Sequence, residues 1–126
     1  MRARILIIED NPTNLELMDY LLKSSGHEVL PAVDGEMGLE LARSAAPDLI
    51  ICDIQIPKLD GFAVARCLKA DARLRYIPLV AITAFAMVGD RERMLAGGFD
   101  EYVSKPIDPQ AFVAQMEAFL KPPQAD

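Results

Sequence analysis

The sequence has few residues of the types that build metal centres, disulfides or histidine-based active sites: its 126 residues include one histidine and two cysteines. Cys52 ends an apolar run and Cys67 falls in a helical pattern, with no metal-ligand spacing and no secretory signal, so both are expected to be buried free thiols. His27 follows Gly26 in a stretch that predicts a loop, and it is expected to be a surface residue without a catalytic role. Neither residue type therefore supplies a candidate site.

Positive charge is also scarce, since 13 Lys and Arg stand against 19 Asp and Glu, for a formal net charge of −6. A nucleic-acid surface normally shows a basic patch, so no direct contact with nucleic acid is expected. Long hydrophobic runs are missing near the start: the apolar stretch after Arg4 has only four residues, too short for a signal peptide or a membrane span. The chain is therefore expected to be cytoplasmic, without membrane contact.

No glycine-rich phosphate loop is present, neither Gly-x-Gly-x-x-Gly nor a Walker loop. A flavodoxin-like cofactor binder would need a loop rich in Ser, Thr or Gly after its first strand. Here the first apolar run is followed by Glu9, Asp10, Asn11 and Pro12, which would repel a phosphate. The sequence therefore disfavours a phosphate-bearing cofactor.

The length suits one domain, and 52% of the residues are apolar, enough to bury one core without disulfides or a structural metal. We expect a single domain over residues 1–121 and a flexible tail over residues 122–126. The tail starts at two prolines, a boundary that suits both a complete protein and a domain cut from a longer chain.

Short apolar, β-branched runs alternate with amphipathic segments of about ten to fifteen residues, the pattern of repeated βα units and a parallel sheet. The expected strands are Ile5–Ile8, Val29–Leu30, Leu49–Cys52, Leu79–Ile82 and, at an edge, Tyr102–Val103. The fold class expected from this order is α/β: a flavodoxin-like (βα)5 doubly wound parallel sheet with strand order 2-1-3-4-5.

A helix is expected after each strand. The first has Asn11 as its N-cap and Pro12 as its first helical residue, and it ends before Gly26. The others are expected from Gly35 to Ala45 with Asp34 as cap, after the Asp60-Gly61 turn signal with Phe62, Ala65 and Leu68 on the buried face, from about Val88 to Ala96, and from Asp108-Pro109 onward.

Polar residues stand where four of the apolar runs end: Glu9 and Asp10 after the first strand, Asp53 after the third, Thr83 after the fourth and Lys105 after the fifth. Strands side by side in a parallel sheet bring their carboxyl ends to one edge, where open α/β sheets place their ligands. The five side chains are therefore expected to converge there.

Three carboxylates gathered at one place would repel one another, so a cation is expected among them. All-oxygen, carboxylate-rich coordination suits Mg²⁺. Asp10 and Asp53 are the expected direct ligands, and Glu9 is expected to bind through water. A carboxylate can also be the nucleophile of phosphoryl transfer, and Asp53, central in the sheet, is the expected phosphoacceptor. Lys105 and the Thr83 hydroxyl would then contact the phosphoryl oxygens.

Each of these residues also has a simpler interpretation. Glu9 and Asp10 could be solvated loop acids favoured by the dipole of the next helix, Asp53 could cap a turn, and Thr83 could be structural. Their coincidence at four strand ends favours the joint site. A phosphatase of the haloacid-dehalogenase type also uses an aspartyl nucleophile with magnesium, but its nucleophile resembles Asp-x-Asp after the first strand, whereas Gln55 is at the second position after Asp53.

These motifs resemble those of the receiver domains of two-component response regulators. The resemblance covers Ile5 to Leu120 and is carried by Ile7-Ile8-Glu9-Asp10-Asn11, Asp53-Ile-Gln-Ile-Pro57-Lys-Leu-Asp-Gly61, Ile82-Thr83-Ala84 and Ser104-Lys105-Pro106. It implies a histidine kinase or a histidine phosphotransfer protein as the phosphoryl donor to Asp53. It also implies that the main-chain carbonyl of Gln55 completes the Mg²⁺ shell and that the Lys105-Pro106 peptide is cis.

The family pattern gives Thr83 and Tyr102 a switching role. A phosphoryl group on Asp53 would draw the Thr83 hydroxyl inward, and Tyr102 would turn into the vacated space. The residues alone leave open that Tyr102 is half-buried core of an edge strand. Within the family, the resemblance is to single-domain regulators of the DivK type and to the receivers of hybrid kinases, through Asp10-Asn11-Pro-Thr-Asn14 and Ala84-Phe85-Ala86-Met87.

The resemblance thus implies a signalling switch, not an enzyme with a separate substrate. The surface of the fourth helix, fifth strand and fifth helix would control a downstream protein, and the chain would be a monomer or a weak dimer. Ala84 is small and next to Thr83, so the phosphoryl group is expected to be open to water and short-lived. A binding module that recognises its partners without phosphorylation is an alternative with the same fold.

Overall fold

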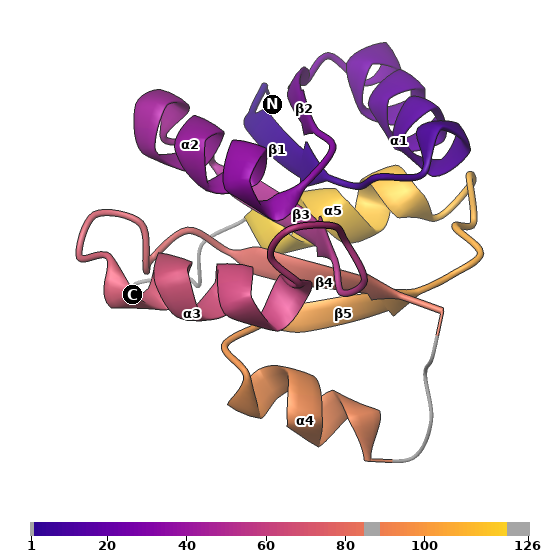
Figure 1. Cartoon of the computed structure of the whole chain (residues 1–126). Coiled ribbons are helices and arrows are strands. Elements are labelled where there is room, and N and C mark those ends of the chain that lie inside the picture. The colour runs from indigo at the N-terminus through magenta and orange to yellow at the C-terminus, as the bar shows by residue number, and fades with distance from the viewer. Residues whose placement is uncertain (1, 85–88, 121–126) are drawn as a thin grey trace, which may run out of the picture.

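The computed structural model describes residues 2–84 and 89–120, and within them five strands form one sheet in the order β2-β1-β3-β4-β5 (Figure 1). All neighbouring strands are parallel. The expected α/β fold and its strand order are therefore confirmed, with β5 at an edge. The strands are β1 (Arg4–Ile8), β2 (Glu28–Ala32), β3 (Leu49–Asp53), β4 (Leu79–Thr83) and β5 (Glu101–Ser104).

The first two helices begin at the caps that the sequence indicates. The side chain of Asn11 accepts a hydrogen bond from the amide of Asn14 and caps α1, whose first residue is a proline. Asp34 and Asp60 cap α2 and α3 in the same way. The helices are α1 (Pro12–Ser24), α2 (Gly35–Ala45), α3 (Gly61–Ala70), α4 (Asp90–Ala96) and α5 (Phe112–Leu120).

Helices cover both faces of the sheet, α1 and α5 on one face and α2, α3 and α4 on the other (Figure 1). Successive side chains of a strand point to opposite faces of the sheet, so each strand contributes side chains to two separate hydrophobic cores. In β1, Ile5 and Ile7 belong to the core with residues of α1 and α5, whereas Leu6 and Ile8 belong to the core with residues of α2, α3 and α4. Because both faces are covered, the three central strands β1, β3 and β4 are almost entirely apolar, as in other parallel sheets, whereas the edge strand β5 is partly polar.

The last helix starts later than the sequence predicts. A helix is expected from Asp108-Pro109, but residues 109–111 form a turn and α5 begins at Phe112. The reason is local: the Asp108 side chain accepts from the amide of Gln110 at 3.0 Å, which favours a turn there. The expected start of the fourth helix at Val88, the residues Phe85–Met87 and the expected tail lie outside the described residues.

His27 corrects the expectation of a surface residue. Its side chain is fully buried, and its Nδ1 accepts a hydrogen bond from the amide of Ala3 at 3.0 Å. Its Nε2 lies 2.8 Å from Oε2 of Glu117 on α5. The loop between α1 and β2 passes beneath α5, a relationship between elements distant in sequence that a local pattern does not reveal.

Cys67 is the second correction. The expectation of two buried thiols holds for Cys52, but Cys67 is exposed. The buried positions of α3 include Val64, Ala65 and Leu68, a helical stripe that leaves position 67 on the outer face.

Among the described residues, no helix is long and apolar enough to cross a lipid bilayer.

Candidate functional site

Three carboxylates meet at the carboxyl edge of the sheet. Glu9 and Asp10 follow β1 and Asp53 ends β3, and these two strands are neighbours with Ile8 opposite Cys52. Each of the three acids offers an oxygen atom that lies within 4.8 Å of the other two. The strand order therefore brings together acids that are more than forty positions apart in the sequence.

The three acids differ in their contact with solvent. Glu9 is fully buried and Asp53 is 5% exposed, whereas Asp10 is exposed. The group is therefore open to water on the side of Asp10.

Two backbone amides hold the buried carboxylates, a feature that the sequence analysis did not anticipate. The Asn11 amide donates to Oε2 of Glu9 at 3.2 Å, and the Gln55 amide donates to Oδ1 of Asp53 at 3.1 Å. In both cases the donor is two residues after the acid. An Asp side chain at the start of a loop commonly accepts a hydrogen bond from the backbone amide two residues later. A loop that starts directly after each acid could therefore have predicted these two hydrogen bonds.

Lys105 supplies the positive charge of the site. Its Nζ lies 2.7 Å from Oδ2 of Asp53 and 3.3 Å from Oε1 of Glu9. The residue follows β5, and its amide donates to the carbonyl of Thr83 at 2.7 Å. The peptide bond between Lys105 and Pro106 is cis.

The electrostatics of the cluster are unbalanced without a further cation. Burial, the hydrogen bond to Asp53 and the charge of Asp53 raise the pKa of Glu9 to about 7, against the opposing effects of the Asn11 amide and Lys105. Burial lowers the pKa of Lys105, but its contacts with Asp53 and Glu9 outweigh this and raise it above the usual range. One ammonium is therefore shared by carboxylates whose mutual repulsion it does not cancel.

The donor set fits a hard divalent cation. The Oε1 atom of Glu9 is buried and has no hydrogen-bond partner among the described residues, although the Lys105 ammonium lies 3.3 Å away. Mg²⁺ prefers oxygen ligands, whereas softer metals prefer sulfur or nitrogen ligands. A group of carboxylates that is open to water on one side therefore suits Mg²⁺. Burial raises the pKa of the neighbouring Cys52 thiol, as do the charges of Asp53 and Glu9, so the thiol stays neutral and competes poorly for a metal.

The two residues expected to form a switch lie along β4 and β5. Thr83 is buried at the end of β4, and Asp53 on the adjacent β3 is opposite Ile82. Tyr102 on β5 is opposite Ala81 and is half-buried against the core formed with α2, α3 and α4. Thr83 is thus close in the fold to the acids, while Tyr102 is two positions further back on the edge strand.

Comparisons with known proteins agree with this geometry. Residues 5–117 match the family model of the response regulator receiver domain. The polar-differentiation response regulators DivK of Brucella ovis and Brucella abortus strain 2308 are 43% identical over 120 residues, which is 95% of this chain and 98% of theirs.

Solved structures share the fold. A putative response regulator from Chloroflexus aurantiacus is 27% identical with a TM-score of 0.89, over 95% of this chain and 98% of that one. The receiver domain of a sensor histidine kinase from Pseudomonas aeruginosa PAO1, with a magnesium ion coordinated in its active-site cleft, is 32% identical with a TM-score of 0.86 over the same shares of both chains.

Proposed function

The chain belongs to the response regulator receiver domain family of two-component signalling, with DivK-like relatives, and we propose that it is a switch that accepts a phosphoryl group on Asp53 in the presence of Mg²⁺. The observation that carries the proposal is the convergence of three carboxylates within 4.8 Å beside the ammonium of Lys105. The domain acts on itself and has no separate substrate.

Mg²⁺ would be held by Asp10, Asp53 and the main-chain carbonyl of Gln55, with Glu9 binding through water. The exposure of Asp10 and the loop start at Gln55 are consistent with this set. The relative from Pseudomonas aeruginosa, crystallised with magnesium in its active-site cleft, supports the choice of metal. When bound, Mg²⁺ neutralises the carboxylates and the incoming phosphoryl group.

In the transfer step, a carboxylate oxygen of Asp53 forms a bond to phosphorus as the bond between phosphorus and the donor histidine nitrogen breaks. The donor imidazole, protonated on its other nitrogen, leaves as a neutral ring. Lys105 provides a point charge for the phosphoryl oxygens, and the Thr83 hydroxyl donates a hydrogen bond to them. Catalysis is then mostly positioning and neutralisation by residues that the fold already holds together.

Phosphorylation would be read through Thr83 and Tyr102. A phosphoryl group on Asp53 draws the Thr83 hydroxyl inward through a charge-assisted hydrogen bond, and Tyr102 turns into the space below α4. Tyr102 lines a surface pocket of about 410 Å³ formed with residues of α4, β5 and α5, among them Arg91, Ser104 and Gln115. A change of Tyr102 alters this surface, which is the face proposed to control a downstream protein.

The phosphoryl donor would be a histidine kinase or a histidine phosphotransfer protein in the cytoplasm, and the output would pass by protein contact, without nucleic acid or membrane. The net charge of −6 agrees with the absence of a nucleic-acid surface. The chain would act as a monomer or weak dimer.

Incubation with Mg²⁺ and acetyl phosphate tests the proposal. Intact mass is expected to rise by one phosphoryl group in the wild type, and not in Asp53→Asn or without Mg²⁺. Asp48→Asn is the matched control, because Asp48 precedes β3 at the opposite edge of the sheet. A wild type that gains no phosphoryl group, or an Asp53→Asn variant that still gains one, contradicts the proposal.

Partner capture tests the output face. Pull-down with and without beryllofluoride, which mimics the phosphoryl group, is expected to give different partner sets for the wild type. Tyr102→Ala is expected to reduce this difference. Identical sets with and without the mimic would favour a binding module that ignores phosphorylation.

A further inference from the structure

The two ends of the loop that follows Asp53, residues 54–60, meet beside the backbone of Asp53. At its end, the amide of Gly61 donates to the carbonyl of Ile54 at 2.8 Å. A Cβ atom on Gly61 would lie 2.7 Å from Cα of Ile54 and 2.8 Å from the carbonyl oxygen of Asp53, closer than real Cβ contacts allow. The two ends of the loop are therefore in direct contact, and a shift of the loop moves the backbone next to Asp53.

The other side of the loop rests on the first turn of α2. The Gly35 amide lies 3.4 Å from the carbonyl oxygen of Pro57 and donates to it. A Cβ on Gly35 would lie 2.5 Å from the carbonyl oxygen of Leu59 and 2.7 Å from its Cβ. The backbone of the loop therefore approaches α2 to a distance that only glycine permits at position 35.

Lys58 adds charge to the same contact. Its Nζ lies 3.7 Å from Oδ2 of Asp34, the N-cap of α2, and 3.7 Å from Oε1 of Glu36. The two acids and the lysine join the first turn of α2 to the tip of the loop. Because Lys58 and Glu36 are largely exposed and both Lys58 distances are long, each ion pair is a weak contact that salt screens.

The backbone at Lys58 is strained. Its φ is 71°, in the left-handed region that non-glycine residues seldom adopt, and the Leu59 amide donates to the Pro57 carbonyl at 2.8 Å, two residues back. This is a γ-turn with a left-handed central residue, an uncommon and strained form. Such strain persists when the surroundings hold it in place, and here α2 does so.

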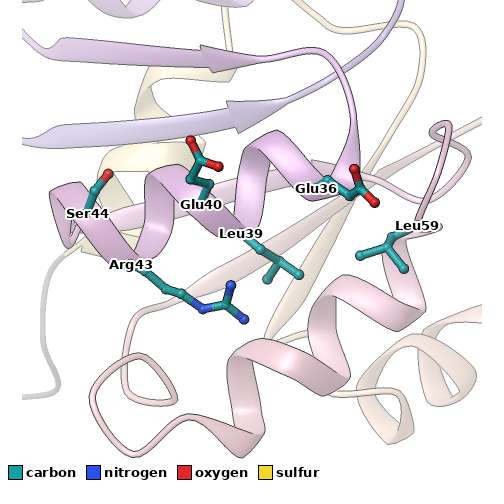
Figure 2. Close-up of a pocket in the computed structure, with 6 residues that line it drawn as sticks. All are labelled: Glu36, Leu39, Glu40, Arg43, Ser44 and Leu59. Atoms are coloured by element: carbon teal, nitrogen blue, oxygen red, sulfur yellow. The ribbon is translucent and has the colours of Figure 1, made fainter.

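The closest backbone approach between α2 and the loop is at this turn. These elements line a cavity of about 520 Å³. Figure 2 shows its lining residues Leu59 and Glu36 on one side and Arg43 and Ser44 of α2 on the other. Beyond its first turn, α2 diverges from the loop around this open space. The turn Asp34–Glu36 therefore makes the hydrogen bond and the ion pairs between α2 and the loop.

From these contacts we propose that Gly35 and Lys58 are positioning residues for the metal site: the first turn of α2 braces the loop 54–60 and fixes the backbone at Gln55 relative to Asp53. The inference rests on the proposed function, in which the Gln55 carbonyl binds Mg²⁺. The Gln55 amide already bonds Oδ1 of Asp53 at 3.1 Å, so loop position and carboxylate orientation are linked. Neither brace residue touches the metal.

Gly35→Ala tests the brace by Mg²⁺ titration in a calorimeter. The added methyl group pushes on loop backbone, and about tenfold weaker Mg²⁺ binding is expected, as when a residue that orients a metal ligand is changed. Helix propensity does not explain such a loss, because alanine favours a helix over glycine. Lys58→Ala is expected to weaken binding about twofold, with recovery in Lys58→Arg.

Gly26→Ala is the matched control. Its φ of 93° makes alanine strained there, but an added Cβ meets nothing within 4 Å, so it lowers stability far from the loop. It is expected to lower the melting temperature and leave the Mg²⁺ affinity unchanged. Equal Mg²⁺ affinities for Gly35→Ala and the wild type would overturn the brace, as would the same loss in Gly26→Ala.

Hydrogen exchange separates the brace from the proposed function. The amides of Leu59 and Gly61 are expected to exchange faster in Gly35→Ala than in the wild type without Mg²⁺, and not in Gly26→Ala. Unchanged exchange overturns the brace. A wild type that binds no Mg²⁺ shows instead that the proposed function has failed, whatever the exchange result.

Discussion

Nζ of Lys105 lies 2.7 Å from Oδ2 of Asp53, although 52 positions separate the two residues in the sequence. The contact joins the end of β5 to the end of β3, with β4 between them. Glu9 reaches the same ammonium from β1, at 3.3 Å. One lysine thus compensates part of the negative charge of acids from two other strands. Changes of Lys105 or of these acids are therefore expected to alter the charge balance of the site.

Replacement of this lysine by methionine keeps the length of the side chain and removes its charge. In Lys105→Met, phosphorylation by acetyl phosphate at saturating Mg²⁺ is expected to slow about tenfold or more, because the transferred group loses its point charge. The rate constant is measured from intact mass against time. Lys105→Arg keeps the charge in a bulkier planar group, and its rate constant is expected to lie between those of Lys105→Met and the wild type. A Lys105→Met rate equal to that of the wild type would exclude this role.

Stability without metal is expected to depend on pH through Glu9. Its pKa is about 7 in the folded chain and lies near its ordinary value of 4.5 when unfolded, so folding favours the protonated form. The contribution is fully present below the unfolded pKa and is lost as the pH rises through 7. Urea unfolding in EDTA is expected to give a free energy of unfolding lower at pH 8 than at pH 5, by on the order of 2 kcal/mol from this group.

Glu9→Gln isolates that contribution, because it has no proton to lose. The variant is expected to show a flatter dependence of stability on pH than the wild type. Mg²⁺ is expected to raise the free energy of unfolding of the wild type at pH 8, because it binds the ionised carboxylates of the folded chain. Parallel pH profiles for the two proteins would show that Glu9 is not the titrating group.

His27 is expected to matter for stability and not for the site. His27→Ala leaves the Ala3 amide without its acceptor and creates a cavity under α5, so a loss of about 2–3 kcal/mol in the free energy of unfolding is expected. Glu117→Gln, which changes the other partner of the ring, should have a smaller effect, because that carboxylate is partly exposed. Urea unfolding measures both losses. A fall in the Mg²⁺ affinity of folded His27→Ala would contradict this assignment.

Ala84 is exposed and directly follows Thr83. A long side chain at this position is expected to shield the phosphoryl group from water, so Ala84→Met should dephosphorylate several-fold more slowly than the wild type. The decay is followed by intact mass after removal of acetyl phosphate. The matched control is Ala114→Met, on the exposed side of α5, which should leave the decay rate unchanged. A substitution of Ala32 would not serve as a control, because Ala32 is buried in the core. Equal decay rates for Ala84→Met and the wild type would exclude a screening role.

Local patterns predicted the elements well where the signal lies within a few residues. Asn11, Asp34 and Asp60 cap the helices that the sequence placed after them, because a cap depends on a side chain and an amide three residues on. The start of α5 was wrong for a similar local reason, since Asp108 also bonds the amide of Gln110 and favours a turn. Such competition between cap and turn depends on small energy differences that spacing does not show.

The chain's own sequence determined the strand order and the gathering of Glu9, Asp10 and Asp53 at one edge, since short continuous apolar runs in βα alternation leave few ways to arrange a parallel sheet. Only the tertiary structure decided which side chains became buried between elements, such as His27 beneath α5, and how closely Gly35 approaches the loop after Asp53. These contacts depend on how helices lie over the sheet, which is set by packing across the whole domain and not by any segment alone.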